Sequence, residues 1–509
     1  MKKNPFNLVI LALLILAPYV HVYPQEATAS LSPASATRAP IPVDPITIEV
    51  DCKKTLRTFS VNPVGFCVSF INDGDTADKQ SLAAQLKSIN VGSLRFPEGA
   101  LAESYLFHDL RKGAPEEGHL QPIATSLGKI PNRSRWLQDE FFIPETLDFD
   151  EFMTLCQKTG AEPIVIVSAK GNRFRDSQSD EETLLRNAEE WVRYANVTRK
   201  LGVKYWEIGN EVDLMKSQKV LSMEEYLEFY RKVVTRMKAV DPTIHTGLGT
   251  GGGSRYTRAA MGIFPELVDF VVIHKYASEI TTYKDYLNTK VSFFNDALGT
   301  LKAIDELAPE ARRKQTEILI TEFSSFSWVK DPPLPPERRL NSIMNAMLTF
   351  EMMAQGVSLD DRVRTMDFWI TRNPWSPEGS TDFSNALDPK NEILPQGRGV
   401  EMMSRFVRDK MVGVTCPPGP VRCWASTSHD TSATTVWLIN RDQQSAVVEL
   451  KISGTSGNQE WSTWALNGTN PNDTSPTWGA SQPVTMKDGS IKITVPPLSI
   501  TAIYKEKRP

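Results

Sequence analysis

The chain has 509 residues, of which 40% are hydrophobic and 23% are charged, and its formal net charge is −4. This is the composition of an ordinary globular protein, and the near-neutral charge gives no reason to expect a nucleic-acid partner. The length allows more than one domain, although an α/β barrel can exceed about 250 residues as a single unit.

The N-terminal segment, residues 1–29, has the layout of a secretory signal peptide. Lys2 and Lys3 precede the apolar run LVILALLILA, and ATA at residues 27–29 is a candidate cleavage site. The run is about half of the roughly 20 residues that a membrane-spanning helix needs, so a signal is favoured over an anchor. No cysteine follows it directly, which argues against a lipoprotein. We therefore expect a secreted or periplasmic protein without stable membrane insertion.

The next segments differ in composition. Residues 30–45 are rich in Ala, Ser, Thr and Pro, which predicts a disordered linker. Residues 46–62 begin with ITIEVD, an alternating pattern that predicts an N-terminal strand. We expect this strand to pair with strands of a C-terminal domain.

Residues 63–404 alternate short apolar runs with amphipathic helical patterns such as KQSLAAQLKSI and EYLEFYRKVVTRMKAV. The runs are apolar nearly throughout, as in parallel strands that are covered on both faces. They number eight, which is the count that closes a (β/α)8 TIM barrel. An open doubly wound sheet is the alternative, but its usual Gly-rich turn is missing after the first run, in SFINDGD. The predicted strands are 64–70, 91–97, 163–169, 203–209, 244–249, 268–274, 317–323 and 365–371.

The pattern changes in residues 405–509. Segments such as TTVWLINRD, SAVVELKIS and IKITVPPLSITAIYK alternate apolar and polar residues between turns, and helical patterns disappear. This predicts an appended antiparallel β-sandwich. The expected fold class is therefore α/β, a barrel followed by a sandwich.

Two carboxylates stand at predicted strand ends. The fourth strand is followed by Asn210 and Glu211, and the seventh ends around Glu322. In such barrels the carboxyl ends of the strands carry the active site. Paired carboxylates suit glycoside hydrolysis, in which one protonates the leaving oxygen and the other attacks the anomeric carbon or activates water. Glu207 shares a strand face with Glu211 but lies deeper, so it is interpreted as a structural, paired carboxylate.

The sequence shows no set of metal ligands. The first predicted strand lacks the His-x-His pair that metal hydrolases of this fold usually offer there. We therefore expect no metal and no other cofactor, because two carboxylates supply both proton transfer and covalent catalysis.

Several motifs resemble a known clan. WEIGNE and ILITEF, separated by three strands, look like the acid/base and nucleophile strands of the retaining (β/α)8 glycoside hydrolases. SLRFPEGALAESY resembles the R-[YFW]-P-G-G turn of α-L-arabinofuranosidases and heparanase-like β-glucuronidases, and VVIHKYA resembles their sixth strand. ITVPPLSITAIY is similar to the last strands of their sandwich. The chain departs at Glu98, where those families usually carry the first Gly.

The resemblance implies a role for each matching residue. Glu211 would be the acid/base, protonated at rest, and Glu322 the nucleophile. Asn210 would hydrogen-bond the sugar 2-hydroxyl, and Tyr276 would donate to Glu322. His274 and Arg95 would brace the same cluster, with Arg95 favouring a charged Glu322.

Other residues are substrate-binding candidates from their position alone. Trp328 and Trp369 lie near the ends of the seventh and eighth strands and are candidates for stacking on sugar rings, although Trp is also a common core residue. Arg173 leads a group of basic residues after strand ends that would suit a uronate or sulfated sugar. A solvated rim is the alternative interpretation of these bases. Lys170, Arg175, Lys275 and Arg372 complete the group.

The sequence thus predicts a secreted retaining glycoside hydrolase that cleaves a plant, algal or matrix polysaccharide by double displacement. Its partner would be an oligo- or polysaccharide. The alternative is a carbohydrate-binding protein on the same fold that has lost catalysis, against which the presence of both glutamates argues. The sequence leaves open the sugar, the linkage, exo or endo action and the oligomeric state.

Overall fold

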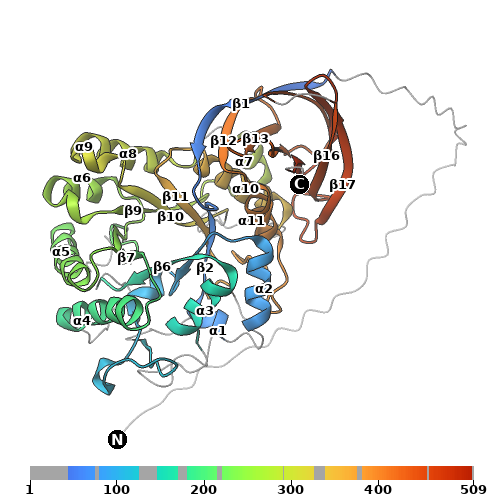
Figure 1. Ribbon diagram of the computed structural model, residues 1–509. Coiled ribbons are helices and arrows are strands. Elements are labelled where there is room, and N and C mark those ends of the chain that lie inside the picture. The colour runs from blue at the N-terminus through green and yellow to red at the C-terminus, as the bar shows by residue number, and fades with distance from the viewer. Residues whose placement is uncertain are drawn as a thin grey trace, which may run out of the picture. The chain divides into compact units, whose positions relative to one another are not determined.

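The computed structural model describes residues 44–74, 79–124, 146–169, 180–214, 221–289, 292–325, 339–374, 376, 381–454 and 458–506 (Figure 1). The predicted signal peptide, most of the predicted linker, Arg173 and Trp328 lie outside these residues. No helix in the described ranges is long and apolar enough to cross a membrane.

Eight parallel strands close into a barrel, which confirms the predicted fold class. Each predicted run overlaps one barrel strand, and consecutive strands pair in parallel around the ring, with β11 returning to β2. The central residues of these strands are buried because side chains fill the barrel interior and helices cover the outside. The strands are β2 (Val64–Cys67), β3 (Ser93–Phe96), β6 (Glu162–Val167), β7 (Tyr205–Ile208), β8 (His245–Leu248), β9 (Phe270–Tyr276), β10 (Glu317–Ser324) and β11 (Val363–Phe368).

The helices begin where the sequence supplies caps. Asp148 and Ser222 each form a capping box at the start of α3 and α5, in which the cap side chain and a Glu three residues later satisfy free backbone N–H groups. The helices are α1 (Phe70–Gly74), α2 (Lys79–Ile89), α3 (Phe149–Thr159), α4 (Glu181–Val192), α5 (Met223–Val240), α6 (Ser254–Ile263), α7 (Tyr283–Asn288), α8 (Asn295–Leu307), α9 (Glu310–Arg313), α10 (Ile343–Val357) and α11 (Pro395–Phe406).

Shorter elements complete the barrel domain. The stretch Arg193–Thr198 (η3) continues α4 as a π-helix. Three single 3₁₀ turns are η1 (Ala100–Ser104), η2 (Leu110–Lys112) and η5 (Pro265–Leu267). The strands β4 (Tyr105–Leu106) and β5 (Ile123–Ala124) pair antiparallel after β3. The turn η1 follows β3 directly, and it therefore lies at the carboxyl end of the barrel.

The C-terminal strands form a sheet in the order β17-β16-β19-β14-β13-β12-β1-β15-β18. The N-terminal strand β1 (Ile46–Thr58) pairs antiparallel with β12 and parallel with β15, and Figure 1 shows it in blue beside the orange β12. Trp461, Val436 and Leu450 belong to the core of this sheet. The other members are β12 (Lys410–Thr415), β13 (Val421–Thr427), β14 (Thr434–Asn440), β15 (Ala446–Ser453), β16 (Gln459–Asn467), β17 (Thr477–Met486), β18 (Ser490–Val495) and β19 (Ser499–Lys505).

The helix α10 packs between the barrel and the C-terminal sheet. All but one of its residues are buried, because it packs against the barrel on one side and meets the sheet on the other. The Phe350 and Trp437 ring centroids are 6.0 Å apart across this contact. Arg422 of β13 pairs with Glu351 of α10, so a charge pair reinforces the apolar contact.

A carboxyl group lies in the barrel interior, and among the described residues no cation forms an ion pair with it. Asp367 of β11 is fully buried, and Ser93 donates a hydrogen bond of 2.5 Å to its Oδ1. Burial raises the pKa of Asp367 to about 7, against which the hydrogen bonds from Ser93 and Thr365 act. A Cβ at Gly65 would stand 2.0 Å from the same oxygen, so the interior packs tightly around the carboxyl group.

We expect Asp367→Asn to flatten the pH dependence of stability. The folded-state pKa is raised, so the stabilisation from the bound proton is complete below about pH 4 and is lost as the pH rises through about 7. The amide does not ionise, so the effect of the substitution on the free energy of unfolding should be more favourable at pH 8 than at pH 4, by on the order of 4 kcal/mol. Chemical denaturation between pH 4 and 8 measures this, with exposed Asp44→Asn as the control. Parallel pH curves for wild type and Asp367→Asn would contradict the assignment.

Candidate active site

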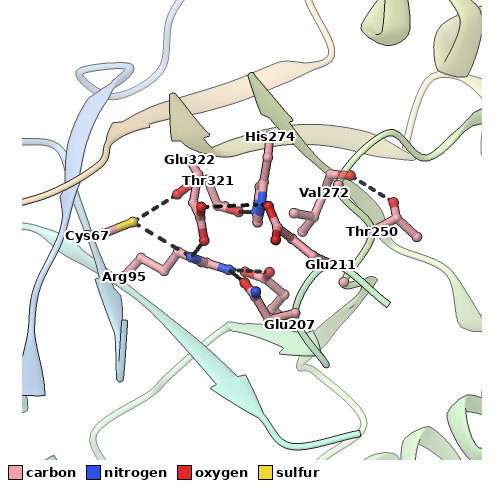
Figure 2. Close-up of polar contacts among 12 residues, drawn as sticks. Cys67, Arg95, Glu207, Glu211, Thr250, Val272, His274, Thr321 and Glu322 are labelled. Atoms are coloured by element: carbon pink, nitrogen blue, oxygen red, sulfur yellow. Dashed lines mark hydrogen bonds and ion pairs between the residues drawn. The ribbon is translucent and has the colours of Figure 1, made fainter. Parts of the chain in front are cut away.

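Two glutamates face one another across His274 at the carboxyl end of the barrel (Figure 2). Nδ1 of His274 lies 2.9 Å from Oε1 of Glu211 and 3.5 Å from Oε2 of Glu322. One oxygen of each carboxylate and this nitrogen all lie within 4.8 Å of one another. Glu322 is 4% exposed, whereas the side chain of Glu211 is 21% exposed. Of the pair, Glu211 is therefore the more accessible acid.

The backbone turns sharply around Glu211. β7 ends at Ile208, and the two residues that flank Asn210 both have positive φ, 78° at Gly209 and 51° at Glu211. Positive φ is uncommon for a residue other than Gly and persists only where the surroundings enforce it. The turn therefore breaks the alternation of the strand, and the backbone geometry helps to direct the Glu211 side chain.

Arg95 hydrogen-bonds residues of both β7 and β10. It is fully buried and forms a bidentate pair with Glu207, through Nε at 2.9 Å and Nη2 at 2.6 Å. Its Nη1 donates to Oε1 of Glu322 at 2.8 Å, and its Nη2 also donates to Oδ1 of Asn210 at 2.8 Å. One guanidinium therefore orients the inner carboxylate, the amide and Glu322 together, and Glu207 has the paired structural role that the sequence predicts.

The charges on this cluster follow from burial and neighbours. Burial acts to lower the pKa of Arg95, but Glu207 and the other negative groups around it hold that pKa well above its usual value. Burial raises the pKa of Glu322, while His274 and Arg95 act to lower it. Arg95 thus acts toward a charged Glu322, but the effect of burial on the pKa is larger.

His274 and Tyr276 both lie on β9. His274 contacts both glutamates, and Tyr276 contacts Glu322. Burial acts to lower the pKa of His274, but Glu322 and Glu211 raise it above its usual value. Nε2 of the same ring lies 3.3 Å from Oγ1 of Thr321. The Tyr276 hydroxyl donates to Oε2 of Glu322 at 2.6 Å, and burial raises the pKa of Tyr276, which keeps the phenol protonated as a donor.

Asn210 keeps one donor group available. The residue is 1% exposed, its Oδ1 accepts from Arg95, and its backbone N–H donates to Glu103 at 2.7 Å. Its Nδ2 is buried and has no hydrogen-bond partner among the described residues. A buried amide N–H without a partner is costly, and this group can still donate a hydrogen bond.

The turn after β3 closes against Glu322. A Cβ at Gly99 would lie 2.4 Å from Oε1 of Glu322 and 2.6 Å from Cζ3 of Trp369, so only Gly fits there. Glu98, which stands where related families usually carry a Gly, has φ of 96° and keeps a backbone conformation that favours Gly. The peptide C=O of Glu98 accepts from Arg95 at 3.0 Å. Glu98 therefore holds a backbone conformation that a Gly would adopt without strain.

The remaining predicted binding residues have different outcomes. Trp369 is 4% exposed and packs with Cys67, Ile370 and Tyr276, so it borders the site, and stacking on a sugar stays a prediction. Trp328 and Arg173 fall outside the described ranges. Arg372, one of the basic residues of the acidic-sugar hypothesis, is buried and paired with Asp73. Its charge is therefore not available to a substrate.

Glu103 is a site residue that the sequence reasoning missed. It belongs to η1, and its carboxylate binds the backbone of Asn210 and Ala169. No local pattern distinguishes it from a surface glutamate, because its partners come from β6 and β7.

The donor set of Glu211, His274 and Glu322 has a spacing that could hold a metal ion. Both oxygens of Glu322 already accept hydrogen bonds, from Arg95 and Tyr276. The positive charge of Arg95 next to Glu322 also disfavours a divalent cation there. The arrangement therefore fits a proton-transfer site better than a metal centre.

Comparisons with known proteins find partial sequence matches to arabinofuranosidases. The chain is 25% identical over 257 residues to an intracellular exo-α-(1→5)-L-arabinofuranosidase of Acetivibrio thermocellus, covering 46% of each chain. It is 25% identical over 189 residues to a probable α-L-arabinofuranosidase C of Aspergillus fumigatus, covering 35% of this chain and 34% of that one. The matches thus span half or less of the curated relatives' length. No family model matches the sequence.

A solved structure extends the likeness to the whole fold. The α-L-arabinofuranosidase of Thermotoga maritima, crystallised with arabinose, superposes with a TM-score of 0.70 at 18% identity, covering 91% of this chain and 100% of that one. At that identity the superposition shows the fold alone, a barrel with an appended sandwich. Together with the sequence matches, it confirms the predicted resemblance to α-L-arabinofuranosidases.

We expect Arg95→Lys to lower the free energy of unfolding by about 3 kcal/mol, because a Lys ammonium cannot reproduce the fork that pairs with Glu207 and leaves buried acceptors unsatisfied. Urea denaturation measures the loss. The matched control is Arg236→Lys, whose ion pair with Glu182 is 36% and 62% exposed, and which should change stability by less than about 1 kcal/mol. Similar small changes in both variants would contradict the central role of Arg95.

Proposed function

We propose that the protein is a retaining glycoside hydrolase that releases α-L-arabinofuranosyl units from a plant polysaccharide. The observation that carries the proposal is the pair of Glu211 and Glu322, whose oxygens lie within 4.8 Å across His274. Retaining enzymes hold their two carboxyl groups about 5–5.5 Å apart, whereas inverting enzymes leave room for a water between them. The resemblance to α-L-arabinofuranosidases supports the choice of sugar.

The first chemical step breaks the glycosidic bond. Glu322 attacks the anomeric carbon and forms a glycosyl ester, while Glu211 gives its proton to the departing oxygen, which leaves as an alcohol. In the second step Glu211, now ionised, takes a proton from water. The resulting hydroxide oxygen displaces Glu322 from the anomeric carbon and restores both residues. The greater exposure of Glu211 supports its role as the group that meets leaving group and water.

The neighbouring residues would tune these steps. Tyr276 and Arg95 hydrogen-bond separate oxygens of Glu322, and both favour its ionised form once the substrate occupies the site. The Nδ2 group of Asn210 is suited to donate to the sugar 2-hydroxyl, an interaction that strengthens at the transition state. His274 contacts both glutamates, so it would keep the two carboxylates at their working separation.

The export of the protein is a separate proposal. It rests on residues 1–29, whose basic, apolar and small-residue regions follow the order of a signal peptide. The Acetivibrio thermocellus relative is named as an intracellular enzyme. The compartment of this protein therefore needs its own test. Expression with residues 1–29 intact should yield mature protein that starts after Ala29 in the periplasm or medium, as N-terminal sequencing will detect. Retention of the full-length chain in the cytoplasm would contradict it.

We expect Glu322→Ala to lose nearly all hydrolysis of 4-nitrophenyl α-L-arabinofuranoside, by a factor of about 10⁴ or more, because no covalent intermediate forms. Azide should fit the space left by the carboxylate and displace 4-nitrophenol to give the β-configured glycosyl azide. The Glu211→Ala variant is the matched control, in which azide should attack the glycosyl-enzyme and give the α-configured azide. NMR of the products distinguishes the two anomers.

The same experiment separates an enzyme from the alternative, a binding protein without catalysis. Wild-type protein that binds arabinofuranosyl oligosaccharides but shows no turnover would favour the alternative. Turnover that survives in Glu322→Ala would contradict the mechanism.

A further inference from the structure

Glu103 joins two strand ends next to the proposed acid. Its Oε1 accepts the backbone N–H of Asn210 at 2.7 Å, and its Oε2 accepts the backbone N–H of Ala169 at 2.9 Å. The hydroxyl of Ser168 lies 3.1 Å from the same Oε2 and donates to the peptide C=O of Glu103 at 2.7 Å. Glu103 is 4% exposed. A single carboxylate from η1 therefore binds the residues that follow β6 and β7.

These contacts act on the peptide that leads into Glu211. The N–H of Asn210 belongs to the peptide unit between Gly209 and Asn210, at the centre of the turn with positive φ on both sides. A Cβ on Gly209 would lie 2.7 Å from Cβ of Ala169 and 3.1 Å from Oε1 of Glu103, so the turn is held closely against both. The strained φ of Glu211 requires restraints of this kind, because an unrestrained residue would relax to negative φ.

We propose that Glu103 is a positioning residue that sets the place of Glu211 through the backbone N–H of Asn210. The inference rests on the proposed function, since it concerns the acid/base role of Glu211. Glu103 itself does not touch the reacting atoms. Its effect passes through the Asn210 N–H and the turn, and it should therefore influence the step that needs proton transfer.

The site specifically requires a carboxylate at this position. Among the described residues, two backbone N–H groups, those of Asn210 and Ala169, donate to the two carboxylate oxygens. An ionised Glu accepts at both oxygens, whereas a Gln side chain places an NH2 group at one of them and must face an N–H donor. Glu103→Gln therefore keeps the size of the side chain and breaks at least one of the contacts. Glu103→Asp keeps the charge and shortens the side chain by one methylene.

The experiment compares two substrates that differ only in the leaving group. Phenyl α-L-arabinofuranoside needs protonation of its departing oxygen, while 4-nitrophenyl α-L-arabinofuranoside depends on it much less. For Glu103→Gln we expect kcat/KM to fall by about 30- to 100-fold with the phenyl substrate and by less than about 5-fold with the 4-nitrophenyl substrate. The Glu211→Ala variant should show the same selectivity, with a larger loss on the phenyl substrate.

The matched control is Glu401→Gln. Glu401 of α11 is another buried glutamate, 3% exposed, and pairs with Arg398 and Arg405 outside the site. Its substitution should lower the melting temperature without changing the ratio of kcat/KM for the two substrates. If Glu103→Gln does not yield folded protein, Glu103→Asp replaces it in the same comparison.

The outcomes distinguish a failure of the positioning role from a failure of the proposed function. An equal loss on both substrates for Glu103→Gln, or no loss, overturns the positioning role while Glu211→Ala keeps its selectivity. Absence of that selectivity in Glu211→Ala overturns the proposed function, and the inference that rests on it. A ratio that shifts in both variants and stays constant in Glu401→Gln supports the proposal.

Discussion

The buried ion pair between Arg95 and Glu207 is the interaction on which the rest of the site depends. An arginine without exposed surface requires a matching negative charge, because the desolvation of a guanidinium in a barrel interior is otherwise very costly. Glu207 supplies that charge through a bidentate contact, which fixes the plane of the guanidinium. The remaining N–H groups then point to Glu322, Asn210 and the turn at Glu98. The geometry of the two proposed catalytic groups thus follows from a pair that itself does no chemistry.

This arrangement separates support from reaction along the axis of the barrel. Asp367, Ser93 and Thr365 form a polar group linked by hydrogen bonds, and Glu207 with Arg95 forms the next. Glu211, His274 and Glu322 stand at the strand ends. All three groups contain buried residues, and burial raises the pKa of both Asp367 and Glu322. The difference is that cations and a phenol hydroxyl surround Glu322, which makes its ionised form accessible to a reaction.

Several backbone features hold the residues of the site in place. Glu211 and Glu98 both hold positive φ, and Gly99 leaves no room for a side chain between Glu322 and Trp369. Strain of this kind is retained where neighbouring contacts over-determine the backbone. Here the contacts are Glu103 on the Asn210 N–H and Arg95 on the Glu98 carbonyl. Glu98 therefore keeps its positive φ because its carbonyl is hydrogen-bonded to Arg95, although the residue type does not favour that conformation.

The sequence by itself determined the eight strands, the barrel and sandwich classes, and the two glutamates at strand ends. These follow from local patterns: apolar runs, breaker residues, and an acid placed after an apolar strand. It also indicated that Glu207 is a supporting carboxylate, since side chains alternate along a strand. Beyond the contacts of Glu322 that the resemblance implied, only the tertiary structure decided which groups meet. The contacts that it decided are the pairing of Arg95 with Glu207, the hydrogen bond from the Asn210 backbone to Glu103, the ion pair of Arg372 with Asp73 and the close approach of Gly99 to Glu322, and all of them join segments far apart in the chain. Such pairings depend on the register with which the barrel closes, and no local pattern of residues carries that information.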